Sequence, residues 1–283
     1  MARKGVIFIA ALALGLGGLS GAAFAAAGAH HPKEMSWSFE GPFGHYDQAQ
    51  LQRGFKVYQE VCSACHSMSL LSYRNLGDKG GPFWNEKYKN PNDNPWAKAV
   101  AAGVQVADID SETGDAITRP ATTADRFKAP FANEAAARAS NGGAFPPDLS
   151  VMAKARHLGP RYIYSILTGY ETPPAGLTVP AGQNFNAYMP GDLGAYWKGP
   201  GHPPQGGFLA MPPPLKPGLV TFDDGTPSTV DQQAKDVAAF LMWAAEPKME
   251  QRKQMGFGVM IFLILFAGIV YASYRRIWRN VSH

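Results

Sequence analysis

The chain has 283 residues, of which 46% are apolar and 17% are charged, and it contains only two cysteines. This composition excludes an intrinsically disordered protein, and two cysteines exclude a small fold held together by several disulfides. The net charge of +4 comes from the two ends of the chain, since residues 26–250 hold 19 basic and all 22 acidic side chains. The central body therefore has a net charge of −3, which disfavours nucleic acid as a partner.

The N-terminus has the pattern of a secretory signal. Arg3 and Lys4 precede an apolar stretch over residues 6–19, and small residues follow as far as Ala27. We predict that residues 1–25 form a cleaved signal peptide, although cleavage after Ala27 fits the pattern nearly as well. A retained N-terminal anchor is the alternative, which the short, glycine-interrupted apolar stretch disfavours.

The expected elements of the central body come in chain order. Apolar residues recur at helical spacing over residues 47–62, and the polar residues 77–131 are expected to be mostly loop. Short helices are expected after Asn133, after Asp148 as far as about residue 155, and from Pro160, because these residues favour helix starts.

The second half of the body combines a long loop with one strong helix. Residues 171–217 contain eleven prolines and many glycines, so we expect an ordered loop there. Residues 228–246 are strongly helical in pattern, and Pro247 is expected to break or kink that helix. Nothing indicates a large sheet, so the predicted fold class is mainly α.

An apolar segment lies near the C-terminus. Residues 255–274 are 20 consecutive residues without a charge, and a helix of that length spans about 30 Å, the thickness of a bilayer's hydrocarbon core. The segment is apolar on every face, which argues against a packed amphipathic helix. We expect residues 251–283 to form one transmembrane anchor with a short cytoplasmic tail, and residues 26–250 to form an exported domain.

The motif that carries chemistry is C-x-x-C-H at the end of the first helix, formed by Cys62, Cys65 and His66. This pattern is typical of covalent attachment of c-type haem, with two thioether bonds and the histidine as an iron ligand. A thioredoxin-like dithiol is one alternative, but it needs a βαβ pattern that is not visible. Half of a zinc site is another, but a second cysteine pair is missing.

The sixth iron ligand is less well defined by the pattern. Met211 lies in a loop stiffened by three following prolines and far along the chain, which suits a ligand on the opposite haem face. Met189, followed by Pro190, competes with it. The pattern also leaves open a second histidine as ligand, and the candidates are His45, His157 and His202.

Several separate blocks of sequence resemble the cytochrome c1 family, the haem subunits of the quinol–cytochrome c reductase (bc1) complex. The resemblance runs from about residue 36 to residue 278. The blocks are RGFKVYQEVCSACHSM, NGGAFPPDLS, AKARH, YIYSILTGY, AMPPPL, FDDGTP and KDVAAFLMWAAEPKMEQRKQMG. The resemblance implies a class I cytochrome c-like haem domain with long Pro/Gly-rich loops.

The resemblance also implies roles for individual residues. It makes Cys62 and Cys65 the thioether cysteines of one haem c, with His66 and Met211 as the iron ligands. It suggests that Arg156 pairs with a haem propionate and that Tyr162 lies near the propionates. Asn141, Pro146 and Pro147 resemble residues that line the haem pocket, where a turn and helix cap is the alternative interpretation.

The implied function is one-electron transfer without substrate chemistry at the haem itself, since both axial positions of the iron would be filled. The resemblance implies electrons taken from the Rieske iron–sulfur protein and passed to a soluble or membrane-bound c-type cytochrome, beside cytochrome b in a dimeric complex. It also implies a bacterial inner membrane, with the haem domain on the periplasmic side.

Other functions remain open at this stage. They are a membrane-anchored c-type cytochrome of another electron-transfer chain, a haem enzyme or gas sensor with an open sixth position, and an assembly subunit with a structural haem.

Six acidic residues are candidates for steering a basic partner towards the haem. They are Asp108, Asp110, Glu112, Asp115, Asp223 and Asp224.

Overall fold

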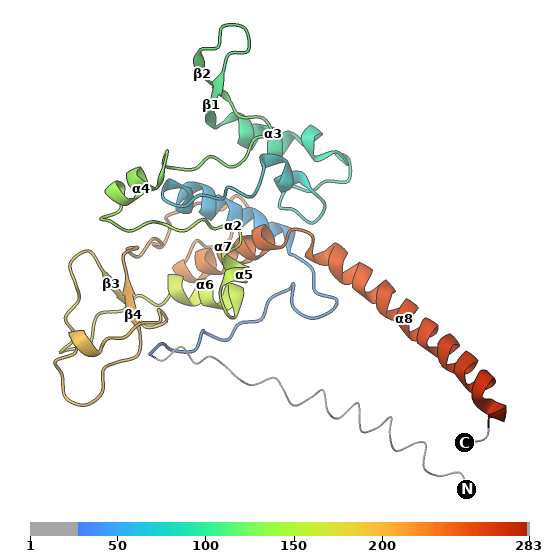
Figure 1. Cartoon of the computed structure of the whole chain (residues 1–283). Helices are drawn as coiled ribbons and strands as arrows, with labels where there is room; N and C mark the ends of the chain where they lie inside the picture. The colour runs from blue at the N-terminus through green and yellow to red at the C-terminus, as the bar shows by residue number, and fades with distance from the viewer. Residues whose placement is uncertain (1–27, 282–283) are drawn as a thin grey trace.

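The computed structural model describes residues 28–281, so the predicted signal peptide, residues 1–25, lies outside the described part. Helices make up most of the regular secondary structure of the described residues, in agreement with the predicted mainly α class (Figure 1). The α-helices are α2 (Gln48–Glu60), α3 (Pro95–Ala102), α4 (Glu134–Ser140), α5 (Met152–Ala155), α6 (Gly159–Leu167), α7 (Val230–Ala245) and α8 (Met249–Ile277). The strands are β1 (Gln105–Ile109), β2 (Ala116–Pro120), β3 (Asn184–Asn186) and β4 (Gly207–Leu209). Short 3-10 helices cover Cys62–Ala64, Tyr73–Gly77, Pro91–Asp93, Gly194–Tyr196 and Trp278–Asn280.

The core is built where α2 crosses α7, two helices far apart in the sequence (Figure 1). The ring of Phe240 on α7 lies 5.6 Å from that of Phe55 and 5.8 Å from that of Tyr58 on α2. All three side chains are buried, and Trp243 stacks on Phe240 from the next turn of α7. Apolar burial at this crossing thus fixes the helix that leads into the C-x-x-C-H motif.

Gly54 makes the close crossing of α2 and α7 possible. A side chain there would place its Cβ 2.1 Å from the carbonyl oxygen of Asp236 and 2.7 Å from the Cβ of Phe240. A buried polar cluster lies beside this contact, because the fully buried Asp236 accepts hydrogen bonds from Arg53 Nε at 2.7 Å and from Gln50 Nε2 at 3.2 Å. The charge of Asp236 is thereby compensated inside the core.

The predicted helices were mostly found where the pattern put them. Asp47 caps α2, Asn133 caps α4, and Pro160 lies in the first turn of α6. α7 begins at Val230 with Thr229 as its cap, two residues later than expected, and ends at Ala245 before Pro247.

Residues 77–131 are mostly loop, as expected, but two elements within them were not predicted. This segment contains α3, capped by the side chain of Asn94, and the antiparallel hairpin of β1 and β2. In Figure 1 the hairpin projects away from the helical core. Its strands have largely exposed or half-buried residues, so the sequence lacks the apolar alternation that marks a buried strand.

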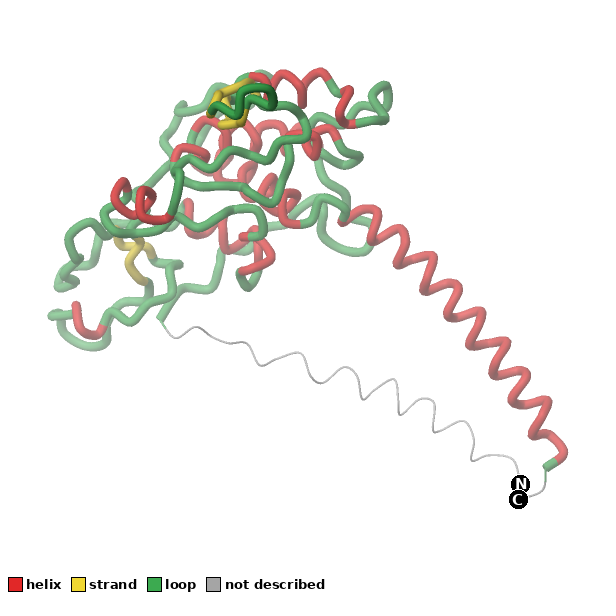
Figure 2. Tube along the Cα trace, turned by 45° about the horizontal axis from the view of Figure 1, so that its top comes forward, coloured by secondary structure: helices red, strands yellow, loops and turns green. Residues whose placement is uncertain are grey.

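Residues 171–217 form an ordered loop with no α-helix, as expected, but β3 and β4 pair within it. The pair is antiparallel and joins Asn184 to Leu209 and Asn186 to Gly207. Within residues 28–281 the strands form only two two-stranded sheets, which confirms that there is no large sheet (Figure 2).

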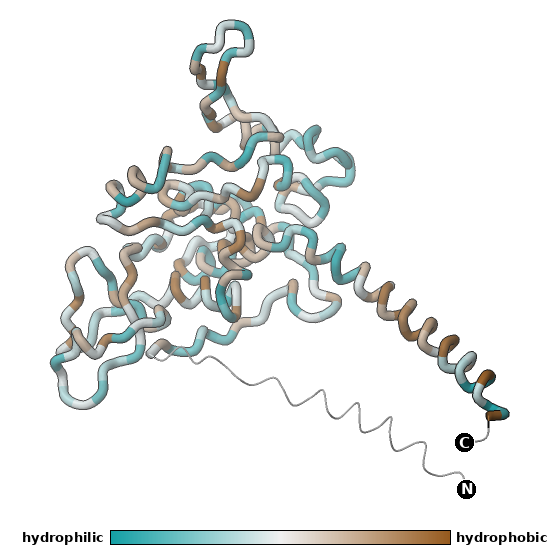
Figure 3. Tube along the Cα trace, viewed as in Figure 1, coloured by the Kyte–Doolittle hydropathy of each residue, from teal (hydrophilic) through white to brown (hydrophobic). Residues whose placement is uncertain are grey.

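α8 extends away from the domain as a single long helix and carries the predicted span (Figures 1 and 3). Among residues 28–281, one helix is long and apolar enough to cross a membrane, and its most apolar stretch is entirely exposed. An exposed apolar helix of this length in water would be unstable, whereas lipid covers it without cost. Within residues 28–281, α8 is therefore the one candidate membrane span.

Candidate functional site

The C-x-x-C-H motif lies on a tight turn directly after α2. The amides of Cys65 and His66 both donate to the carbonyl oxygen of Cys62, at 3.1 and 2.9 Å. The two cysteines are not joined by a disulfide, and Cys62 is half-buried while Cys65 is exposed. The turn therefore presents two unpaired sulfurs and an imidazole from one short segment.

The two alternative uses of this cysteine pair find no support in residues 28–281. Burial, with a smaller contribution from Cys65, raises the pKa of the Cys62 thiol to about 12, whereas a reactive dithiol needs a depressed pKa. The described strands occur only as antiparallel pairs, so the βαβ unit of a thioredoxin-like site is absent there. The described residues also contain no group of three metal-binding His, Cys, Asp or Glu side chains.

The ring of His66 is oriented by a contact across the chain. Its Nδ1 lies 2.8 Å from the carbonyl oxygen of Pro147, an acceptor, so Nδ1 carries the hydrogen and Nε2 keeps a free lone pair. Burial lowers the pKa of His66, and the bond to Pro147 offsets this only in part, so the ring is neutral near pH 7. A neutral, oriented imidazole is the form that binds a metal.

Asp148 fastens the segment that follows His66 to the loop that holds Pro147. Its Oδ2 accepts hydrogen bonds from Ser67 Oγ at 2.8 Å, from the Ser69 amide at 2.8 Å and from Ser69 Oγ at 2.7 Å. Its Oδ1 accepts from the amide of Ser150 at 2.8 Å. The amide of Leu149 also donates to the carbonyl of Ser67 at 2.9 Å, so the two segments are tied at several points.

The role of Asp148 corrects the prediction that it caps a helix. α5 begins at Met152, and its cap position is Val151, which has no side-chain cap bond. Burial alone would raise the pKa of Asp148, but hydrogen bonds from Ser150 and Ser69 outweigh it and hold that pKa well below its usual range. Asp148 is thus a charged clamp on the His66 segment.

The methionines divide into core residues and loop residues. Met68 is fully buried, and Met35 and Met152 pack against the hydrophobic core. Met189 and Met211 instead lie half-exposed in the loops on either side of β4. The three candidate histidines, His45, His157 and His202, are exposed.

Met211 and Met189 are held in different ways. The carbonyl of Met211 accepts hydrogen bonds from Tyr170 Oη at 3.0 Å and from Asn184 Nδ2 at 3.4 Å, so its backbone is fixed. The sulfur of Met189 accepts a hydrogen bond from Tyr162 Oη at 3.8 Å. Tyr162, implied to lie near the haem propionates, therefore contacts Met189. Tyr170 and Asn184 were missed from the sequence, because nothing local marks them.

The remaining residues implied by the resemblance lie around the loop between α4 and α5. Asn141 ends α4 and donates from its side chain to the carbonyl of Ala137 at 2.7 Å, which agrees with a helix cap. Pro146 is half-buried, and Pro147 is the exposed residue that fixes His66. Arg156 is exposed and donates to the carbonyl of Ala155, so its charge is accessible to an anion.

These donors suit a covalently bound haem. Two unpaired thiols lie one turn apart beside an imidazole whose outer nitrogen is already hydrogen-bonded, and a thioether and an accessible guanidinium are available from other loops. A haem bound there would be held by Cys62, Cys65 and His66 on the α2 side.

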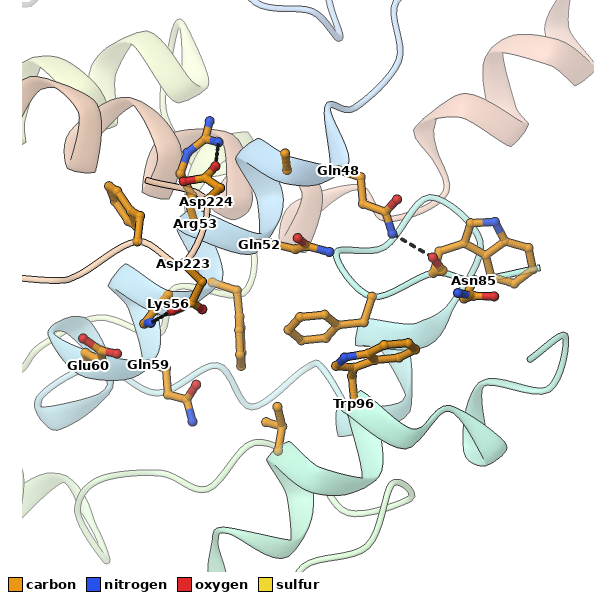
Figure 4. Close-up of a pocket in the computed structure, with 16 residues that line it drawn as sticks. Gln48, Gln52, Arg53, Lys56, Gln59, Glu60, Asn85, Trp96, Asp223 and Asp224 are labelled. Atoms are coloured by element: carbon orange, nitrogen blue, oxygen red, sulfur yellow. Dashed lines mark hydrogen bonds and ion pairs between the residues drawn. The ribbon is translucent and has the colours of Figure 1, made fainter. Parts of the chain in front are cut away.

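A groove lies elsewhere on the domain. It has a volume of about 600 Å³ and lies between α2, the segment around Asn85, Trp96 and residues 222–224 (Figure 4). Two ion pairs cross its edge, from Lys56 to Asp223 at 2.8 Å and from Arg53 to Asp224 at 2.6 Å. None of the predicted haem residues lines it, so it is separate from the candidate site.

Comparison with known proteins identifies the family. Residues 37–281 match the Cytochrome C1 family. The chain is 42% identical to the cytochrome c1 of Blastochloris viridis, across 97% of this chain and 96% of that protein. It is 45% identical to the mitochondrial heme protein cytochrome c1 1 of Arabidopsis thaliana, across 86% of this chain and 71% of that one.

A further relative is longer. The cytochrome b/c1 protein of Bradyrhizobium diazoefficiens is 41% identical across all of this chain, which spans 40% of the relative's length. The family match covers both cysteines, His66 and the loop of Met211, as well as α8. The chain therefore belongs to the cytochrome c1 family, the haem-bearing electron carriers of the bc1 complex.

Proposed function

We propose that a haem c attached through Cys62 and Cys65 is bound by His66 and Met211, and that it passes single electrons from the Rieske protein to a c-type cytochrome. The observation that carries the proposal is the hydrogen bond from His66 Nδ1 to Pro147, which leaves Nε2 free beside two unpaired thiols. The bound haem supplies a reversible one-electron store, and a thioether ligand raises its potential.

The chain's own residues keep this site rigid. Pro147 and Asp148 hold the imidazole and the segment after it, while Tyr170 and Asn184 fix the backbone of Met211. Rigid ligands favour fast electron transfer, because little of the surroundings must rearrange when the charge changes. We propose that Arg156 pairs with a propionate, and that Tyr162, Asn141, Pro146 and Pro147 border the haem.

Location follows from the two apolar ends of the sequence. We propose that residues 1–25 are removed, that residues 26–250 lie in the periplasm of a bacterium, and that residues 251–283 anchor them in the inner membrane. The basic residues flanking the span bias its orientation only weakly, so the export signal supports this direction.

Family membership makes cytochrome b and the Rieske protein neighbours in the complex, and we propose that the complex is dimeric. The acceptor is proposed to be a basic c-type cytochrome steered by acidic side chains. Asp223 and Asp224 are each paired with a cation, so the acids at the hairpin tip, Asp110, Glu112 and Asp115, carry more of any long-range attraction.

Stopped-flow spectroscopy on membranes holding the complex tests the electron-transfer role. Added quinol should reduce the c-type haem within the catalytic turnover time, and a basic soluble c-type cytochrome should then reoxidise it. High salt should slow the second step but leave the first unchanged. A haem that quinol does not reduce on this timescale would contradict the proposed role.

A further inference from the structure

One apolar side chain of the domain is displayed next to the membrane helix. The ring of Phe43 is 80% exposed, more than any other large apolar side chain in residues 28–281. It lies on the loop before α2, and its centroid is 6.2 Å from that of Phe257 on α8. Phe257 is two residues, or about 3 Å of helix, inside the predicted span, which begins at Met255.

The loop that presents Phe43 is a rigid turn. Gly41 has a φ of 71°, in the left-handed region. A Cβ on Gly44 would meet the carbonyl oxygen of Glu40 at 2.1 Å, so the turn requires glycine there. The amide of His45 closes the loop by donating to the carbonyl of Ser38 at 3.1 Å. The backbone conformation of this turn therefore directs the side chain of Phe43 outward.

The same loop is clamped to the first turns of α8. Lys253 donates from Nζ to the carbonyl oxygens of Phe39 at 2.7 Å and Gly44 at 3.3 Å. Glu250 accepts a hydrogen bond from the amide of Tyr46 at 2.7 Å. These contacts fix the height of Phe43 relative to the span.

The negative charge of Glu40, three residues before Phe43, is compensated by other groups of the domain. Glu40 accepts from Arg161 at 2.7 Å through one carboxylate oxygen and from the amide of Trp37 at 3.2 Å through the other. No free charge of the loop then opposes transfer of the ring out of water. At the other end of α8, Tyr274 and Trp278 have ring centroids 6.1 Å apart, which gives both ends of the span an aromatic pair.

We propose that the loop of residues 41–44 is a second membrane contact, with Phe43 inserted at the lipid interface beside Phe257. The occupant is phospholipid, because Phe43 continues the exposed apolar surface of α8 at the depth where its uncharged segment begins. The inference rests on α8 being the membrane span. A second contact beside α8 restricts the tilt of the domain relative to the bilayer.

Photocrosslinking in native membranes tests this contact. Phe43 is replaced by the photoreactive residue p-benzoylphenylalanine in the full chain, which keeps an aromatic ring at an exposed position. The matched controls carry the same residue at Phe262, within the span, and at Ile109, which is 68% exposed on the projecting hairpin. After illumination, the chain is purified and phospholipid adducts are detected by mass spectrometry.

The expected result is a phospholipid adduct at position 43 in a yield similar to that at position 262. No phospholipid adduct is expected at position 109. A crosslink from 43 to another polypeptide, or an adduct at 262 without one at 43, would overturn the proposal. Absence of adducts at both 43 and 262 would overturn the membrane span as well. If the purified chain carries no haem but still forms a phospholipid adduct at position 43, the proposed haem attachment is contradicted and the membrane contact of Phe43 is supported.

Discussion

Replacement of Asp148 by asparagine tests the clamp on the His66 segment. The carboxylate Oδ2 accepts three hydrogen bonds, from the hydroxyl of Ser67 and from the amide and hydroxyl of Ser69. An amide NH₂ in that position accepts none of them, whereas an amide oxygen in the place of Oδ1 still accepts from Ser150. Asp148→Asn therefore removes bonds to a charged acceptor while changing the side-chain volume little.

The expected loss follows from the number of bonds. A hydrogen bond to a charged group contributes about 1.5–3 kcal/mol when buried, and the half-exposed setting of Asp148 lowers this to about 1 kcal/mol each. Loss of three such bonds should reduce the free energy of unfolding by about 3 kcal/mol at pH 7. With a urea dependence of about 2–3 kcal/mol per molar, the midpoint should fall by about 1 M.

The pH dependence gives a second signature. Because the pKa of Asp148 is lower in the folded state than its unfolded value of about 3.9, its stabilisation is fully present above that value. It is lost as the pH falls through the folded pKa. The parent chain should therefore lose stability between about pH 5 and pH 2, and Asp148→Asn should lose less over that range.

The assay is urea unfolding of the full chain in detergent, followed by haem absorbance and tryptophan fluorescence at several pH values. Asp115→Asn, on the exposed loop of the hairpin, is the matched control and should leave the midpoint unchanged. An Asp148→Asn midpoint equal to the parent's at pH 7, with the same acid dependence, would refute the clamp.

Three further predictions concern the haem domain. Cys62→Ser should leave at most the thioether to Cys65, so one vinyl group of the haem stays unmodified and the reduced haem should absorb at a longer wavelength than in the parent; an unchanged spectrum would contradict a bond to Cys62. Arg156→Ala should weaken haem retention or shift the midpoint potential of the haem, because a propionate loses its charged partner. If haem retention in a guanidinium titration and the midpoint potential in a redox titration are both unchanged, Arg156 does not pair with a propionate. Deletion from Met255 onwards should release a soluble red domain, since Glu250 and Lys253 remain to hold the loop before α2; a fragment without haem would contradict independent folding.

The sequence predicted the helices that meet in the core, because their apolar faces are periodic and their caps are local. Asp47, Asn133 and Pro160 each act within one turn of the helix that they begin. The C-x-x-C-H motif could be found for the same reason, since its three residues occupy one short turn.

Long-range contacts explain what the sequence did not predict. Asp148 looks like a helix cap in its own neighbourhood, but Ser67 and Ser69 lie about eighty residues away. Met189 and Met211 both precede a proline, and only the bonds from Tyr162, Tyr170 and Asn184 distinguish how they are held. β1 and β2 were missed because their outer residues are solvated, and β3 and β4 because three residues are too few to show a period.

We propose that Met211 completes the iron coordination begun by His66. A redox titration of Met211→Leu beside Met189→Leu tests it most directly, because both variants remove a thioether next to a proline and keep a similar volume. Met211→Leu should retain covalent haem and lower its midpoint potential by on the order of 100 mV, within the range of about 0.8 V that axial ligands span, while Met189→Leu should change the potential little. An unchanged potential in Met211→Leu together with a fall in Met189→Leu would contradict it.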